Sequence, residues 1–166
     1  RGTSDFSKAS LDEAFELAKV RTLGAAPEPL DREVQVKIAG FGGQGVLSLG
    51  IMLTQAGQIA ARKVSWYPSY GPEQRGGTSN CSVVISDREI GSPVVYQPDV
   101  LVAMNRPSLE RFMADVKPGG LILYEAAMGA VELPAGVRAQ AVPAQKLATE
   151  AGNPKAANTA MFGVLM

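Results

Sequence analysis

The stretch Val34-Gln-Val-Lys-Ile-Ala-Gly-Phe-Gly-Gly-Gln-Gly-Val-Leu-Ser-Leu-Gly50 decides the fold of this 166-residue chain. A short apolar run enters a turn packed with glycines, and an apolar segment with helical spacing leaves it. Gly40, Gly42 and Gly45 match the G-x-G-x-x-G pattern, which brings backbone N–H groups and a helix N-terminus up to a phosphate-bearing ligand. The stretch therefore predicts a strand, a turn that exposes amides, and a helix that packs closely on the strand through Gly45.

Downstream of this unit, strand and helix patterns alternate. Strands are predicted at 34–39, 64–67, 79–86, 98–104, 121–124 and 137–142, and helices at 44–61, 107–116, 143–151 and 154–166. Pro68 is expected to stop the strand before it, and residues 92–95 are expected to return beside 79–86 as a hairpin. The alternation predicts an α/β fold with a Rossmann-like, doubly wound, mostly parallel sheet in three layers, and the hairpin would make the sheet mixed.

Upstream of the first strand, residues 1–33 form a separate segment. Ser10 and Glu13 match a capping box at the start of an apolar helical stripe, which a glycine and two prolines then end. We expect a helical arm and linker at 1–33, followed by a single domain at 34–166. The arm either packs on its own domain or reaches a partner subunit, and its separate linker favours the partner. The helical pattern still runs at Met166, so we expect a longer natural chain.

The composition excludes several kinds of chemistry. The chain has one cysteine and no histidine, which rules out an internal disulfide, a cysteine-ligated cluster and histidine-based catalysis within it. We therefore predict no catalytic and no metal-binding residues. Lys plus Arg and Asp plus Glu number 16 each, so nothing indicates attraction to nucleic acid or to an acidic membrane. Without a membrane-spanning run or a secretory leader, we expect a cytoplasmic protein.

The glycine turn lacks the features of two common nucleotide sites. A dinucleotide site needs an acidic residue at the end of the second strand, but Val64–Pro68 has none and the next acid is Glu73. An NAD dehydrogenase is therefore disfavoured. A Walker P-loop is excluded because no Gly-Lys-Ser/Thr follows the turn. The glycines either bind another anionic ligand, allow tight strand–helix packing, or hold a loop of another chain.

A second glycine-rich stretch, residues 69–77, carries the other candidate site residues. Arg75 can clamp a phosphate or carboxylate with two parallel hydrogen bonds, and Glu73 can orient it. The alternative is a surface Glu–Arg pair that adds little stability. The glycine content favours a ligand or subunit contact. The candidates in this stretch are Tyr70, Gly71, Glu73, Arg75, Gly76 and Gly77.

One further candidate follows a buried strand. Asn105 lies where open α/β sheets bind ligands, at the carboxyl end of a strand. Its alternative role is to cap the helix that begins near Pro107. With the first turn, the predicted ligand contacts are Gly40, Gly42, Gly43, Gln44, Gly45 and Asn105. Cys81 is interpreted as a buried small apolar residue.

Several of these motifs resemble one family. The stretch Gly40-Phe-Gly-Gly-Gln-Gly45 and the stretch Trp66-Tyr-Pro-Ser-Tyr-Gly-Pro-Glu-Gln-Arg-Gly-Gly-Thr-Ser-Asn-Cys-Ser-Val-Val-Ile-Ser86 resemble the gamma subunit of 2-oxoacid:ferredoxin (acceptor) oxidoreductases. This is the gamma-type domain of pyruvate and ketoisovalerate oxidoreductases. Residues 90–93, 98–105 and 152–154 continue the resemblance, which leaves residues 1–33 outside. The stretch Trp66–Tyr70 is more similar to the branched-chain and general 2-oxoacid branches than to the pyruvate branch.

The resemblance implies a cytoplasmic complex that oxidatively decarboxylates a 2-oxoacid to an acyl-CoA. It implies thiamine diphosphate with Mg²⁺, iron–sulfur clusters and CoA in the complex, none of them held by this chain alone. The implied partners are alpha, beta and ferredoxin-like delta-type subunits, with ferredoxin as the electron acceptor and neither nucleic acid nor membrane involved. The gamma domain would pack against the catalytic subunits and shape the region where CoA enters.

Three functions therefore stay open. The first is a non-catalytic gamma subunit, in which Gly42–Gly45 present amides while Glu73 and Arg75 make a polar contact near CoA or a neighbouring subunit. The second is an independent nucleotide-binding or sensor domain. The third is an indolepyruvate oxidoreductase beta-type subunit, which shares the fold and the glycine turn but typically differs in the second loop.

Overall fold

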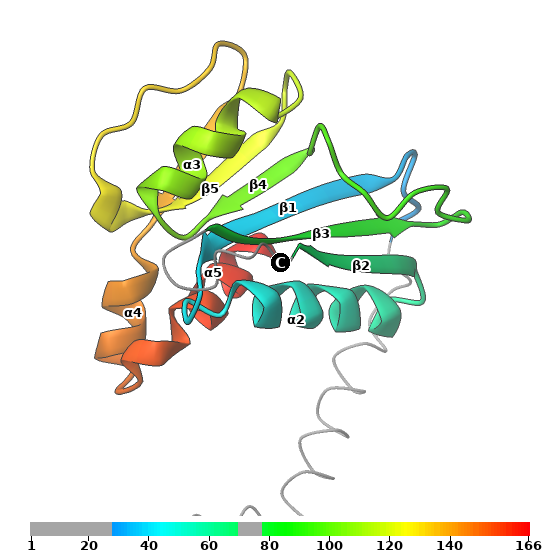
Figure 1. Ribbon diagram of the computed structural model, residues 1–166. Coiled ribbons are helices and arrows are strands. Elements are labelled where there is room, and N and C mark those ends of the chain that lie inside the picture. Colours follow the sequence, from blue (N-terminus) through cyan, green and yellow to red (C-terminus); the bar gives the residue numbers. More distant parts are fainter. Residues whose placement is uncertain (1–27, 70–77) are drawn as a thin grey trace, which may run out of the picture.

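The computed structural model describes residues 28–69 and 78–166, and they form one six-stranded sheet with helices on both faces (Figure 1). The strands lie in the order β2-β3-β1-β4-β5-β6. Their bounds are β1 Val34–Phe41, β2 Lys63–Ser69, β3 Thr78–Ser86, β4 Val100–Ala103, β5 Leu121–Glu125 and β6 Arg138–Val142. Within the predicted arm and linker, residues 1–27 lie outside the described residues.

The sheet is mixed because of β3 alone. β1, β4, β5 and β6 run parallel, whereas β3 lies antiparallel between β2 and β1. The predicted hairpin partner of β3 was wrong, since residues 92–95 form no strand. Both edges of β3 are already paired, one with β1 and one with β2, so a returning segment has no free edge to join.

The strand β2 continues through Pro68, although a proline was predicted to stop it. Pro68 lies opposite Cys81 of β3, and the strand ends one residue later at Ser69. Since β2 is an edge strand, one side of it needs no ladder hydrogen bonds, and a proline without an N–H can be tolerated there.

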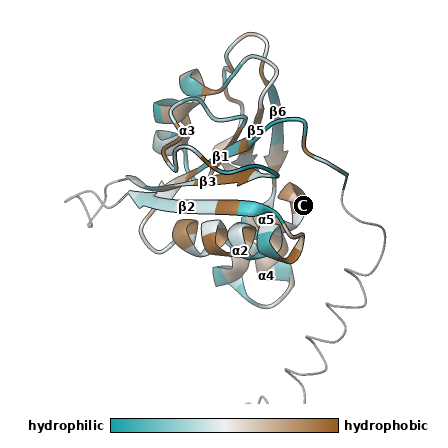
Figure 2. Cartoon of the chain, turned by 90° about the vertical axis from the view of Figure 1, so that its right-hand side faces the viewer, coloured by the Kyte–Doolittle hydropathy of each residue, from teal (hydrophilic) through white to brown (hydrophobic). Residues whose placement is uncertain are grey.

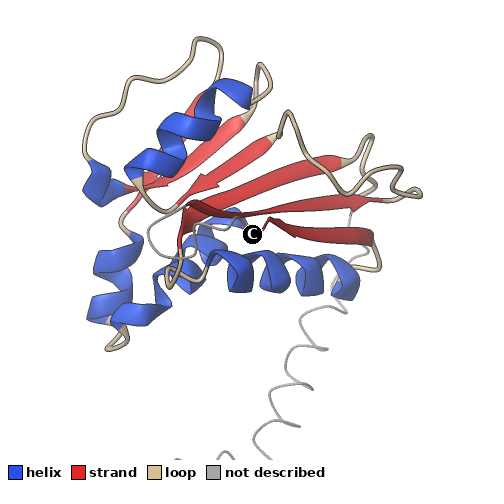
Figure 3. Cartoon of the chain, in the orientation of Figure 1, coloured by secondary structure: helices blue, strands red, loops and turns tan. Residues whose placement is uncertain are grey.

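The helices divide into two layers (Figure 3). α3 covers β1 and β4 on one face, and α2, α4 and α5 cover the other. The predicted three-layer, doubly wound arrangement is thus confirmed. The helices are α2 Val46–Ile59, α3 Arg106–Phe112, α4 Ala144–Glu150 and α5 Ala157–Leu165, with short 3-10 turns at Met113–Asp115, Ala126–Met128 and Pro154–Ala156. Among these described helices, none is long and apolar enough to span a membrane.

Two apolar clusters hold the layers together. The larger one lies between the sheet and α2, α4 and α5, and Figure 2 shows the brown hydrophobic turns of α2 below the sheet. Burying one leucine such as Leu49 of α2 stabilises the fold by about 2 kcal/mol. The smaller cluster lies under α3. Together they include Ile38, Leu49, Leu53, Val83, Val102, Leu123 and Met161 in the larger cluster, and Leu101, Leu109, Phe112 and Ile122 in the smaller.

The strand directions give the sheet two different edges. The carboxyl ends of β1, β2, β4, β5 and β6 meet at one edge, which lies on the left of Figure 1. The glycine turn between β1 and α2 lies at this carboxyl edge. The opposite, amino edge carries the starts of the same strands and the lead segment 28–33. Open α/β sheets bind ligands at the carboxyl edge, so the turn lies where a ligand is expected.

Candidate functional site

The glycine turn links the end of β1 to the start of α2. The N–H of Gln44 donates to the carbonyl of Phe41 at 3.2 Å, which closes the turn. Gly43 and Gly45 have positive φ angles of 90° and 74°. Residues with a Cβ rarely adopt this left-handed conformation, so the turn requires glycine at these two positions.

Two glycines of the turn are needed for close packing. A Cβ on Gly40 would lie 2.7 Å from Val46 Cγ2 of α2 and 2.9 Å from the Cβ of Met104. A Cβ on Gly45 would lie 2.5 Å from the Nδ2 atom of Asn158 in α5. The close approach between helix and strand was predicted at Gly45 but occurs at Gly40. Gly45 instead makes room for α5.

The side chain of Gln44 joins two strands. Its Oε1 atom accepts hydrogen bonds from the N–H of Phe41 at 2.7 Å and from Nδ2 of Asn105 at 2.8 Å. Its Nε2 atom donates to the carbonyl of Met104 at 3.1 Å. The partly buried side chain thus connects the carboxyl ends of β1 and β4, and it fixes the conformation of the turn that follows β1.

Asn105 caps α3, which is the alternative role that the sequence left open for it. Its Oδ1 atom accepts from the N–H of Ser108 at 2.9 Å, and proline occupies the first turn of the helix. Since its Nδ2 group donates to Gln44, the Asn105 side chain is engaged at both ends. The structure therefore brings Gln44 and Asn105 together, but as partners of each other.

The backbone of the turn has donors to offer. Gly42 and Gly43 are exposed, and the N–H groups of Gly42, Gly43 and Gly45 donate to no other described residue. α2 begins without a side-chain cap and without an acidic residue in its first turn. The positive end of the helix dipole is therefore uncompensated by any described side chain, which favours an anionic group at this place.

The second predicted loop lies outside the described residues, but its two ends are placed. The candidates in it are Tyr70, Gly71, Glu73, Arg75, Gly76 and Gly77. Ser69 pairs with Asn80, and Thr78 pairs with Phe41, the last residue of β1. Both ends of the segment 70–77 thus lie at the carboxyl edge, as the glycine turn does.

One residue that contacts the turn was not among those predicted from the sequence. The Nδ2 group of Asn158 in α5 donates to the carbonyl of Gly45 at 3.4 Å, across 113 positions of sequence. An asparagine near the start of a helix has no local pattern that would reveal such a contact. Only the folded arrangement of α5 beside the turn identifies it.

The single cysteine is in an environment that makes its thiol unreactive. Cys81 is fully buried in β3, and a Cβ on Gly50 of α2 would lie 2.6 Å from its sulfur. Burial raises the pKa of the Cys81 thiol to about 11. The interpretation of Cys81 as a buried apolar residue is consistent with this position. Across the described ranges, no group of three or more His, Cys, Asp or Glu side chains is arranged to hold a metal ion.

Comparison with known proteins gives a family match and close relatives. Residues 35–166 match the family model described as pyruvate ferredoxin/flavodoxin oxidoreductase. The ketoisovalerate oxidoreductase subunit VorA of Methanothermobacter marburgensis is 54% identical over 170 residues, which cover 100% of this chain and 35% of the relative. The chain thus spans about a third of that relative's length. The alignment includes residues 1–33, which the motif resemblance left outside.

Solved structures show the same arrangement of the chain. The gamma subunit of a keto/oxoacid ferredoxin oxidoreductase from Geobacter sulfurreducens superimposes with a TM-score of 0.67 at 29% identity, over 80% of this chain and 75% of that one. A 2-oxoglutarate:ferredoxin oxidoreductase from Magnetococcus marinus, solved with 2-oxoglutarate, coenzyme A and succinyl-CoA bound, gives a TM-score of 0.69 at 26% identity. That match covers 78% of this chain and 23% of the other.

Proposed function

The chain belongs to the pyruvate ferredoxin/flavodoxin oxidoreductase family, and on that basis we propose that it is the gamma-type part of a 2-oxoacid:ferredoxin oxidoreductase. The observation that carries the proposal is the 54% identity to a ketoisovalerate oxidoreductase subunit along the whole chain. The same match favours a branched-chain 2-oxoacid as the substrate. The assembly would convert this acid and CoA to an acyl-CoA in the cytoplasm.

In this proposal the bond-breaking chemistry lies on other chains. This proposal is supported by the absence, among the described residues, of any group of three or more His, Cys, Asp or Glu side chains arranged to hold a metal ion, and by the burial of the one cysteine. Alpha, beta and delta-type subunits would hold thiamine diphosphate with Mg²⁺ and the clusters. Ferredoxin would take up the electrons. This chain would contribute binding and shape.

The turn fits an anionic part of CoA better than a neutral ligand. The N–H groups of Gly42, Gly43 and Gly45 face no described acceptor, and the dipole of α2 adds a partial positive charge there. Gln44 would hold this turn in place without touching the ligand, given its three contacts within the protein. Arg75, which lies in the sequence between Ser69 and Thr78 at the same edge, would supply a guanidinium for a phosphate.

Purification of the assembly tests the proposal. We expect this chain to copurify with larger subunits, and the assembly to reduce a dye in the presence of a 2-oxoacid and CoA. Ketoisovalerate should give a higher kcat/KM than 2-oxoglutarate or pyruvate. A solitary chain that carries the whole activity, or a complete assembly that is inactive with all three acids, would contradict the proposal.

Arg75 gives a sharper test of the CoA contact. Arg75→Ala should raise the apparent KM for CoA about tenfold in the assembly, while the KM for the 2-oxoacid stays unchanged. Arg88→Ala is the matched control, because Arg88 is exposed and follows β3 at the amino edge. An unchanged KM for CoA together with weaker assembly would instead assign Arg75 to a subunit contact.

A second candidate function is an independent nucleotide-binding domain, favoured by the uncapped start of α2 alone. Such a domain would bind CoA, NAD or FAD by itself with at least micromolar affinity, or about −8 kcal/mol. Titration calorimetry of the isolated chain with each of the three separates the two functions. The gamma-type proposal expects weak or no binding of any of them without partner subunits.

A further inference from the structure

A second concave site lies at the amino edge, on the opposite side of the sheet from the glycine turn. Its cavity has a volume of about 540 Å³. The floor is apolar and consists of Val34, Val100 and Leu121, which are only partly buried at the starts of β1, β4 and β5. A cavity of this size with an exposed apolar floor is large enough to hold several side chains of a partner.

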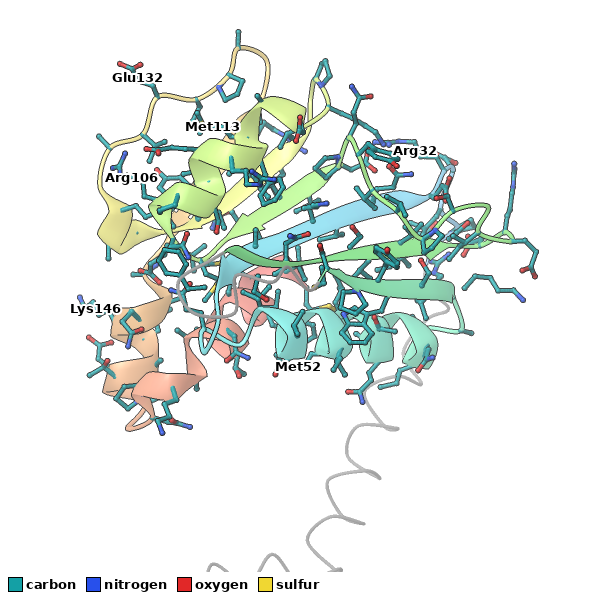
Figure 4. The ribbon with its side chains drawn as sticks, in the orientation of Figure 1. Arg32, Met52, Arg106, Met113, Glu132 and Lys146 are labelled. Atoms are coloured by element: carbon teal, nitrogen blue, oxygen red, sulfur yellow. The ribbon has the colours of Figure 1, made fainter. Side chains whose placement is uncertain are left out.

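The rim of this cavity is strongly basic. Arg32, Lys117 and Arg138 line it, and Asp99 is the only acid among its lining residues. Figure 4 shows Arg32 near the start of β1, far from Lys146 on α4. In the sheet, Arg138 lies beside Leu121 on the neighbouring strand, so a positive charge adjoins the apolar floor.

Asp99 compensates only part of this charge. It is 7% exposed, forms an ion pair with Arg32, accepts from Lys117 Nζ at 3.1 Å, and accepts from the N–H of Gln35 at 2.8 Å. Burial opposes its ionisation, but the hydrogen bonds from Arg32, Gln35 and Lys117 hold the Asp99 pKa below the ordinary carboxyl value. With Asp99 ionised, two positive charges remain uncompensated. Arg138 forms no ion pair with any described residue.

The backbone around the cavity argues against a small inorganic anion. Such ions are typically held by free N–H groups. Here the N–H of Gly119 donates to the carbonyl of Gly136 at 2.7 Å, and that of Gly120 donates to Lys117 at 2.8 Å. The amides of Leu121 and Arg138 are likewise bonded. The available donors are therefore long cationic side chains, which suit carboxylates on a larger partner.

We propose that this amino-edge cavity docks an acidic segment of another protein chain in the oxidoreductase assembly. Carboxylates of the segment would meet Arg138 and Lys117, and an apolar side chain would cover Val34, Val100 and Leu121. The charge complementarity between the basic rim and an acidic segment, together with the apolar floor, selects this occupant. The inference rests on the proposed function, since it requires the multi-chain assembly.

Charge reversal at Arg138 tests the docking. In the purified assembly, Arg138→Glu should raise the protein concentration needed for association at least tenfold, and added salt should weaken the unsubstituted assembly more than the variant. Because Arg138 pairs with no described residue, the thermal midpoint of the isolated chain should not change. Lys146→Glu is the control, since Lys146 is 74% exposed and lies far from the cavity.

Cross-linking identifies the partner directly. Arg138→Lys keeps the charge and introduces an amine that a carbodiimide can join to a carboxylate within contact distance. We expect mass spectrometry to find an amide between position 138 and an Asp or Glu of a different subunit. The docking is overturned if the Arg138→Glu assembly stays intact and active with unchanged affinity and the Arg138→Lys assembly gives no such cross-link. The proposed function would still stand in that case.

Three other outcomes also overturn it. If inorganic phosphate or citrate gives a heat of binding in calorimetry, and Arg138→Glu abolishes it, the cavity is a site for a small anion. Self-association of the isolated chain in the ultracentrifuge, lost in the same variant, would assign it to a second copy. If the chain enters no assembly at all, the proposed function and this inference fail together.

Discussion

Among single residues, Gln44 shows how a glycine-rich turn is held in one conformation. Glycines allow the turn but do not select it, because they are also the residues with the most freedom in the unfolded chain. The three hydrogen bonds of the Gln44 side chain tie the turn to the ends of β1 and β4. Preorganised N–H groups bind an anion better than mobile ones, so in the proposed function Gln44 would support binding without contacting the ligand.

Removal of the Gln44 side chain should therefore destabilise the chain measurably. Gln44→Ala leaves the N–H of Phe41 and the carbonyl of Met104 without their partner, and we expect a loss of about 2 kcal/mol in the free energy of unfolding. Urea unfolding followed by circular dichroism measures it. Gln58→Ala, on the exposed side of α2, is the control and should change stability by less than about 0.5 kcal/mol. Equal losses in the two variants would contradict the bridging role.

The sequence predicted that Gln44 and Asn105 belong to the site, but it could not predict their partners. Gln44 lies within the G-x-G-x-x-G turn, and Asn105 follows a buried strand, so local patterns were enough to propose both as candidates. Their hydrogen bond spans 61 positions and the contact between Asn158 and Gly45 spans 113. Such contacts depend on which elements become neighbours, and a local pattern contains no information about that.

Among the elements, α2 depends on the residue just before it. Gly45 combines a positive φ of 74° with a space that Asn158 already fills. Gly43 shares the positive φ, at 90°, but nothing lies within 4 Å of an added Cβ. Alanine at Gly43 would therefore introduce backbone strain alone, whereas alanine at Gly45 would introduce backbone strain and steric overlap.

Alanine at these two positions should destabilise the chain to different degrees. Gly43→Ala should cost about 1 kcal/mol from backbone strain alone, and Gly45→Ala should cost at least about 2 kcal/mol because its Cβ also overlaps Asn158. Thermal and urea unfolding give both values. The double variant Gly45→Ala with Asn158→Ala lacks the side-chain amide that the added Cβ would overlap. It should therefore recover part of the stability that Gly45→Ala loses beyond the loss in Gly43→Ala. If the added Asn158→Ala recovers nothing, steric overlap is not the cause.

Element types were predictable, whereas the neighbours of β3 were not. Alternating periodicities gave every strand and helix of the described sheet within a few residues. The hairpin predicted at 92–95 came from treating adjacent sequence as adjacent structure. The stop predicted at Pro68 came from not knowing that β2 is an edge strand, where a proline is tolerated. The burial of Ser82, Val83 and Val84 on both faces of β3 marks a central strand, and a central strand has no edge left for a hairpin return.

In the whole molecule, the two edges of the sheet have different tasks. The carboxyl edge offers backbone N–H groups and the start of α2, whereas the amino edge fixes the chain where it enters the domain. There Arg62 binds Asp87 and the carbonyl of Glu28, and the N–H of Leu30 donates to Asp87 at 2.7 Å. Asp99 then joins Arg32 of the same lead segment to Lys117, beyond α3.

This arrangement gives stability a defined dependence on pH. The folded pKa of Asp99 lies below its ordinary value of 3.8, so its contribution to stability is complete above about pH 4 and is lost as the pH falls through the folded pKa. Asp99→Asn should therefore lower the free energy of unfolding at pH 7 by about 2 kcal/mol, because the buried amide loses its ion pairs. The difference from the unsubstituted chain should shrink as the pH falls through the folded pKa of Asp99, because the protonated carboxyl is neutral, as the amide is.

Urea unfolding of both chains at pH 7, 5, 4 and 3 measures this difference. Asp31→Asn is the matched control, since Asp31 is exposed on the same lead segment and its substitution should change little at any pH. A loss in Asp99→Asn that is equally large at pH 3 and pH 7 would mean that the shape of the side chain matters and its charge does not. A loss confined to neutral pH instead identifies Asp99 as the charge that joins the lead segment, β4 and the turn at Lys117 into one unit.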